Sequence, residues 1–200
     1  MSKNKIMEKL SSLFKEESWG RMEPKDIGIS RFKILDDILN SIIAENVTDD
    51  ALALCKTHLE EQPGSITAAY ISGLMGYQLE KIDEKKHLRK LIEKFTENHK
   101  WAVVELLSEK ILEYGESSFA LRSLATSLER LGRSKEAIPV WDNLLKIDRF
   151  DAQVAKKLAL AIVNQDQEKS IQYMKLSIEG FIKSKGFDEI TPLWQKLVVV

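Results

Sequence analysis

The sequence has 200 residues, enough for one sizeable hydrophobic core or one extended array of repeats. Thirty Lys and Arg nearly balance 31 Asp and Glu, so net charge favours neither nucleic acid nor anionic lipid as a partner. The single cysteine, Cys55, excludes an internal disulfide framework, and 9 Gly with 4 Pro favour helices over a strand-rich fold.

The first residues do not have the pattern of a secretion signal. Apolar positions from Ile6 to Phe14 are broken by charges, whereas a signal peptide needs an uninterrupted apolar stretch. The longest apolar runs of the chain are far too short to cross a bilayer. We therefore expect a cytoplasmic protein with no membrane partner.

Apolar residues at intervals of three and four predict helices along most of the chain. In the first third we expect a short helix over 6–14, a hinge around 19–28, and a longer helix that Ser30 caps. These segments form a predicted N-terminal helical cap, residues 1–48.

From Asp49 onward the predicted helices are regular in length and joined by short turns, which forces antiparallel neighbours. Ser65 and either Ser117 or Ser118 are the expected N-caps, and Gly115 and Gly132 are the expected stops. The expected helices occupy 49–62, 65–77, 83–95, 101–112, 118–131, 134–147, the segment from about 151, 168–183 and the segment after Gly186.

The segment 118–151 carries a recognisable repeat pattern of bulky and small residues around a glycine turn. The positions that carry it are Leu121, Leu124, Ala125, Leu128, Gly132, Ala137, Trp141, Leu144 and Leu145. This pattern resembles a tetratricopeptide repeat. Small Ala125 and Ala137 let the paired backbones approach, while Trp141 fills the groove beside the next helix.

The resemblance implies an all-α fold of antiparallel helix pairs stacked as a right-handed solenoid. We predict a degenerate tetratricopeptide-like domain over 49–200, with its best unit at 118–151. Between 80 and 116 the repeat phases clash and leave one odd helix. The apolar run from Leu197 to Val200 suggests a piece truncated from a longer protein; the alternative is a last helical turn that tucks in.

No recognisable catalytic or metal-binding motif is present, so we expect no enzyme and no cofactor. The three histidines lack ligand spacing and are assigned to solvated helix faces, and Cys55 to the core. The acidic pairs at 36–37 and 49–50 could mimic catalytic carboxylates. They are interpreted more simply as residues of helix N-terminal turns.

Two surfaces are candidate partner-binding sites. The tetratricopeptide resemblance implies a concave face lined by the first helix of each pair, here Tyr70, Tyr77, Phe119, Arg122 and Lys156. The alternative is that Tyr70 and Phe119 only pack against the adjoining helix. A second, basic face runs along the helix from 83, where glutamates interleave with Lys85, Lys86, Arg89, Lys90 and Lys94.

The opening third carries a second resemblance. The stretch from Phe14 to Arg21, then Ser30-Arg31-Phe32 and Leu35-Asp36, resembles the helical extension of long bacterial Gre-type transcript-cleavage factors. It implies a non-catalytic protein-interaction module in transcription elongation, with RNA polymerase or another transcription component as partner. The cleavage residues would then lie beyond residue 200. The alternatives are a free-standing scaffold or chaperone, or an RNA-binding helical solenoid that uses the basic face.

Overall fold

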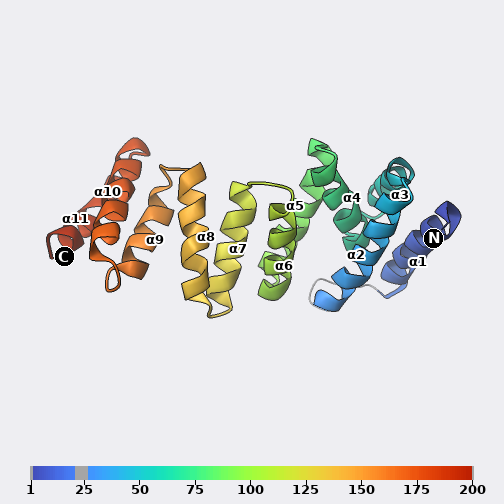
Figure 1. Ribbon diagram of the computed structural model, residues 1–200, viewed down its shortest axis with the longest axis horizontal. Coiled ribbons are helices and arrows are strands. Elements are labelled where there is room, and N and C mark those ends of the chain that lie inside the picture. Colours follow the sequence, from blue (N-terminus) through green and yellow to red (C-terminus); the bar gives the residue numbers. More distant parts are fainter. Residues whose placement is uncertain (1, 21–26, 200) are drawn as a thin grey trace. The chain divides into compact units, whose positions relative to one another are not determined.

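The computed structural model describes residues 2–20 and 27–199, and all regular structure within these residues is helical (Figure 1). The all-α class is therefore confirmed. Eleven α-helices and one 3-10 helix, η2, are described: α1 Lys3–Gly20, α2 Ile29–Ala44, α3 Thr48–Glu61, α4 Ile66–Gln78, α5 Ile82–Glu97, α6 Trp101–Leu112, α7 Ser118–Arg130, α8 Ser134–Ile147, α9 Ala152–Ile162, α10 Gln167–Lys183, η2 Phe187–Glu189 and α11 Ile190–Val199.

Side-chain caps begin several of these helices. The Ser65 hydroxyl accepts a hydrogen bond from the Ala68 amide at 3.2 Å, and Ser117 likewise caps α7. Asp151 caps α9 in the same way. The predicted cap at Ser30 is wrong, because α2 begins at Ile29 after Gly28 and no side chain caps it.

The start of the hinge expected around residues 19–28 is wrong, because Trp19 and Gly20 belong to α1. Helix α1 is longer than the expected 6–14 and continues to Gly20, and α2 follows Gly28; Pro24 lies outside the described residues.

At the C-terminal end of the chain, the side chains of the apolar run Leu197–Val200 also lie outside the described part. Among the described helices, none combines the length and apolar character that a bilayer-spanning segment needs.

The helices divide into two compact units, residues 1–115 (unit 1) and 116–200 (unit 2). Unit 1 contains α1 to α6, so the helices of the expected cap, 1–48, pack with α3 and α4 rather than standing apart. The expected boundary between residues 48 and 49 concerns where the repeat pattern begins, and it stays a prediction. The compact units divide elsewhere, after Gly115.

In unit 1 the closest helix pair is α4 and α5, and two glycines of α4 make this approach possible. A Cβ atom added at Gly73 would lie 2.5 Å from Leu88 Cβ, and one at Gly76 would lie 2.6 Å from Glu84 Cβ. Since real Cβ atoms do not approach so closely, only glycine fits at these two crossings. Helix α6 lies against α2, α4 and α5.

In unit 2, α7 pairs with α8 and α9 pairs with α10. Ala125 and Ala137 are buried at the first crossing, as the repeat pattern predicts. Trp141 is 4% exposed, and its indole Nε1 donates to Glu129 at 2.9 Å. In the second pair, the hydroxyls of Ser170 and Ser177 donate to backbone carbonyls of α9, which satisfies polar groups at a closely packed contact.

Candidate docking surfaces

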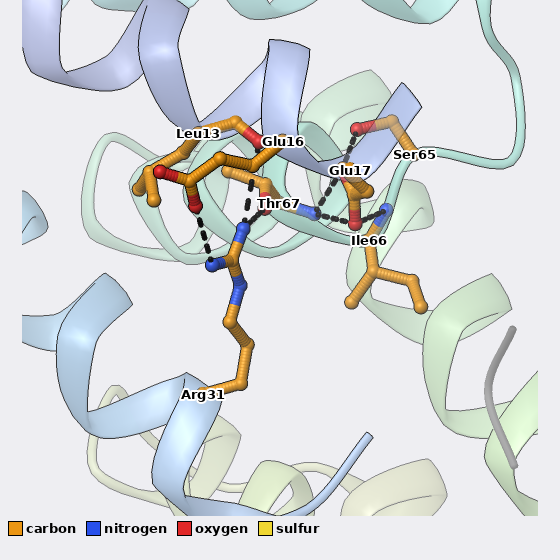
Figure 2. A network of polar contacts seen from close by, with 7 residues as sticks. All are labelled: Leu13, Glu16, Glu17, Arg31, Ser65, Ile66 and Thr67. Atoms are coloured by element: carbon orange, nitrogen blue, oxygen red, sulfur yellow. Dashed lines mark hydrogen bonds and ion pairs between the residues drawn. The ribbon is translucent and has the colours of Figure 1, made fainter. Parts of the chain in front are cut away.

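A buried carboxylate from the N-terminal motif holds the start of α4 (Figure 2). Glu17 is 7% exposed and accepts hydrogen bonds from the Ser65 hydroxyl at 2.6 Å, the Ile66 amide at 2.9 Å and the Thr67 amide at 3.1 Å. The first amides of a helix have no partner within the helix and carry a partial positive charge. Glu17 therefore caps α4 from a distant part of the sequence.

Arg31 connects α2 to the same place (Figure 2). Its guanidinium donates to the Thr67 hydroxyl at 3.1 Å and to the Leu13 carbonyl at 3.5 Å, and it pairs with Glu16 at 3.5 Å. The Arg31 side chain is 12% exposed, so these contacts are partly shielded from water. Three helices, α1, α2 and α4, thus meet around one arginine and one buried glutamate.

Asp36 is a third motif residue with a structural role. Its carboxylate accepts from the Tyr70 hydroxyl at 2.5 Å and pairs with Lys110 of α6 at 3.4 Å. The expectation that Asp36 decorates a helix N-terminal turn is wrong, because it lies in the middle of α2. The motif residues Glu17, Arg31 and Asp36 therefore join the helices of unit 1, and their surroundings explain the motif without a ligand.

The two tyrosines expected on a binding face are largely buried in unit 1. Tyr70 has no exposed surface. Burial, and to a lesser extent the hydrogen bond to Asp36, raises the pKa of its phenol above the ordinary value. Tyr77 is 9% exposed, and its hydroxyl accepts from Arg89 at 3.3 Å. Tyr70 therefore packs against a neighbouring helix, as the alternative expected, and its ring centroid lies 5.1 Å from that of Phe32 on α2.

The expected cations of unit 2, Arg122 and Lys156, do come together. They line one groove of about 330 Å³ between α7, α8 and α9 (the α7–α9 groove). Trp141, Val154 and Leu160 form its apolar lining. Phe119, the remaining residue of the expected face, is half-buried on α7 and does not line the groove.

Each cation of the α7–α9 groove has a carboxylate partner. Arg122 pairs with Asp151, and Lys156 pairs with Glu189. Lys157 pairs with Glu129 at 2.7 Å and lies 4.5 Å from the centre of the Trp141 ring. The groove thus combines an apolar lining with a rim of paired charges, the anatomy of an ordinary protein-docking site.

Sequence reasoning missed Val154 of this groove, and it also missed Gln153 and Lys157. With Lys156 and Leu160 they lie at positions i, i+3, i+4 and i+7 of α9, so all four share one helix face. Helical spacing counted from Lys156 could have found them.

The basic face of α5 is divided among several local contacts. Lys86 pairs with Asp83 at 2.7 Å, and Lys85 lies 5.3 Å from the centre of the Tyr77 ring. Arg89 donates to the Tyr77 hydroxyl. Lys90 is exposed and lies with Lys94 on a different side, against the turn that precedes α4. The face is therefore not one continuous cationic strip.

Two of the three histidines are not on solvated faces, so that expectation is wrong for them. The His58 ring stacks on Phe14 with centroids 4.1 Å apart, and His87 Nδ1 lies 2.9 Å from the buried Ser72 hydroxyl. Burial lowers the pKa of His87 below its ordinary value. Cys55 is buried as expected, and burial raises the pKa of its thiol to about 12. Within the described residues, no group of three or more metal-binding side chains gathers.

Comparison with known proteins supports the resemblance to Gre-related proteins. A relative named transcription elongation factor GreA, from Borreliella burgdorferi, is 32% identical over 198 residues, which are 99% of this chain and 22% of the relative. A GreA-associated domains protein from Treponema pallidum is 31% identical over 183 residues, 90% of this chain and 28% of that protein. The chain thus spans about a quarter of the length of these curated relatives. No protein-family model matches it.

Among solved structures, the chain aligns with YrrB, described as a tetratricopeptide-repeat protein with an unusual peptide-binding site. The alignment covers 81% of this chain and 82% of YrrB, at 15% identity and a TM-score of 0.35.

Proposed function

We propose that this chain is a non-catalytic protein-docking module of a Gre-type transcription elongation factor and acts in the cytoplasm. One observation carries the proposal: nearly the whole chain matches a protein named as elongation factor GreA but accounts for 22% of that protein's length. A segment of this kind, folded as helix pairs, fits a module that adds binding to an activity located elsewhere.

The α7–α9 groove is the proposed docking site. Trp141 and Val154 are almost fully buried at its base, whereas Leu160 is 37% exposed and Arg122 exposes 48% of its side chain. Binding energy at protein interfaces concentrates in a few apolar and arginine side chains at such places. The proposed partner is RNA polymerase or another component of the transcription complex.

The proposal is tested with immobilised chain and purified core RNA polymerase from the source organism. The groove variant is Arg122→Ala, Leu160→Ala, and a matched control, Gln172→Ala, Lys175→Ala, changes two exposed residues of α10. We expect wild type and control to bind polymerase alike, and the groove variant to bind about tenfold more weakly or worse. Equal binding by all three proteins would place the site elsewhere, and absence of binding by wild type would remove polymerase as the partner.

A further inference from the structure

A second pocket lies in unit 1, shares no residue with the α7–α9 groove, and has charges that are all of one sign. It lies between α3, α4 and α5 beside the turn at Pro63 and Gly64, and has a volume of about 220 Å³ (the α5 pocket). The ionisable residues that line it are His87, Lys90 and Lys94, and no carboxylate is among its lining residues. These three positions are i, i+3 and i+7 of α5, so they share one face of that helix.

The lysines of the α5 pocket are not neutralised by the protein itself. Lys90 is exposed, and Lys94 Nζ lies 3.5 Å from the Gly64 carbonyl, which carries no net charge. Within the described part of the chain neither lysine makes an ion pair. This distinguishes the pocket from the α7–α9 groove, where every cation already has a carboxylate partner.

The remaining lining is apolar. Leu59 of α3, Pro63 of the turn and Leu91 of α5 surround the space, and Leu91 is 4% exposed at its base. An apolar side chain of a bound peptide would be removed from water here by packing against this apolar lining. A carboxylate next to it in the same peptide could reach Lys90 and Lys94. The pocket volume suits one such side chain and its neighbour.

The charges beyond the pocket favour a protein over a nucleic acid. A second, larger groove of about 480 Å³ continues from Leu59 and His87, and it is lined by Glu60, Asp83 and Glu84 together with lysines. A nucleic-acid backbone would bring phosphates against these carboxylates, whereas nucleic-acid sites are typically continuous basic surfaces. A short peptide can place its acidic group at the basic end alone.

We infer that the α5 pocket is a docking site for an acidic amphipathic segment of a partner protein, with an apolar side chain between Leu59, Pro63 and Leu91 and a carboxylate on Lys90 and Lys94. This site is independent of the proposed role in transcription and of the α7–α9 groove. Binding through it should weaken as salt is raised, because the lysines are accessible to counterions.

The test uses a display library of short random peptides selected on the wild-type chain. The same library is selected on Lys90→Glu, Lys94→Glu, and on a control, Lys135→Glu, Lys175→Glu, that makes the same change of charge at exposed residues of unit 2. We expect a set of peptides that wild type and control enrich but the pocket variant loses. Those peptides should carry Asp or Glu next to Leu, Met or Phe.

Synthetic copies of these peptides are then titrated by fluorescence anisotropy. Their Kd should rise about tenfold or more for the pocket variant, and by a similar factor when their Asp and Glu become Asn and Gln. If the double reversal disturbs folding, Lys90→Gln, Lys94→Gln keeps the helix surface neutral and should show the same direction of change. Peptides that depend on Arg122 and Leu160, and not on these lysines, report on the α7–α9 groove instead.

Three results would overturn the inference. The selection could yield no peptides that depend on Lys90 and Lys94, or the dependent peptides could lack acidic residues. The third is displacement of the bound peptides by a short oligouridylate, which would identify the pocket as part of an RNA site.

Discussion

Replacement of Glu17 by alanine should destabilise unit 1 far more than the same change at its neighbour Glu16. In the wild type the Glu17 carboxylate satisfies the amides of Ile66 and Thr67 and the hydroxyl of Ser65 in a buried position. After truncation both amides lose their acceptor at the start of α4. An unsatisfied buried donor costs about 1–3 kcal/mol, so the two amides together cost about 2–6 kcal/mol.

We expect a value near the lower half of that range, about 3 kcal/mol, because water can enter the space that the carboxylate leaves. Glu17→Gln retains the volume and one acceptor oxygen but removes the charge that favours the helix N-terminus. Its expected cost is about 1 kcal/mol. The Glu16 side chain is 54% exposed and pairs with Arg31 at 3.5 Å, so Glu16→Ala should cost about 0.5 kcal/mol or less.

The assay is urea unfolding followed by far-UV circular dichroism, with hydrogen exchange of the α4 amides as a local readout. The expected order of unfolding free energies is wild type, Glu16→Ala, Glu17→Gln and Glu17→Ala, from most to least stable. Amide protection should fall first at Ile66 and Thr67 in the Glu17 variants. Equal losses for Glu16→Ala and Glu17→Ala would refute the view that Glu17 caps α4.

Further changes probe the packing and the titrating groups. Trp141→Ala should destabilise unit 2 by about 3–5 kcal/mol in urea unfolding, because it truncates a buried aromatic ring. Gly73→Ala should cost about 1–3 kcal/mol in the same assay, since α4 and α5 must separate to admit the methyl group. Cys55, with a pKa of about 12 in a buried position, should react with a thiol reagent only as fast as the chain unfolds, which a colorimetric time course with and without urea measures. Because burial lowers the pKa of His87, the unfolded state binds more protons than the folded state below the ordinary histidine pKa of about 6.5. Wild type should therefore lose stability as the pH falls below about 6.5, and His87→Gln should lose less in paired melts.

The helices themselves are largely predictable from local sequence. Ser65 and Ser117 cap their helices as expected, and the pattern around Ala125, Ala137 and Trp141 gives the observed α7–α8 pair. These features depend on residues a few positions apart, whose spacing is visible in the sequence.

The long-range contacts are the part that could not be predicted. Glu17 and Ile66 are 49 positions apart, and Tyr70 and Asp36 are 34 apart. No local spacing connects them, so the sequence shows Glu17 only as one member of a charged stretch. For Tyr70 it leaves open whether the side chain lines a binding face or packs against the adjoining helix. The burial of Tyr70 depends on α2, which supplies Phe32 and Asp36, and His87 of α5 contacts a buried serine of α4.

The candidate groove was predictable in part. Arg122 and Lys156 were expected together from the repeat resemblance, and both line the α7–α9 groove. Tyr70 and Tyr77 belong to unit 1 and are largely buried, so they are not part of that groove. The repeat pattern indicates which helix of each pair lines a groove, but contacts with other helices, such as those of Tyr70 with α2, decide which side chains remain accessible.

The most direct test of the docking account is site-specific photocross-linking in the source cells. A photoreactive amino acid replaces Gln153, an exposed residue that lines the α7–α9 groove, or Gln172, an exposed residue of α10 outside it. We expect a cross-link from position 153 to a subunit of RNA polymerase or a transcription factor bound to it, and none from position 172. The same cross-linked products from both positions, or products from position 153 that contain no transcription component, would contradict it.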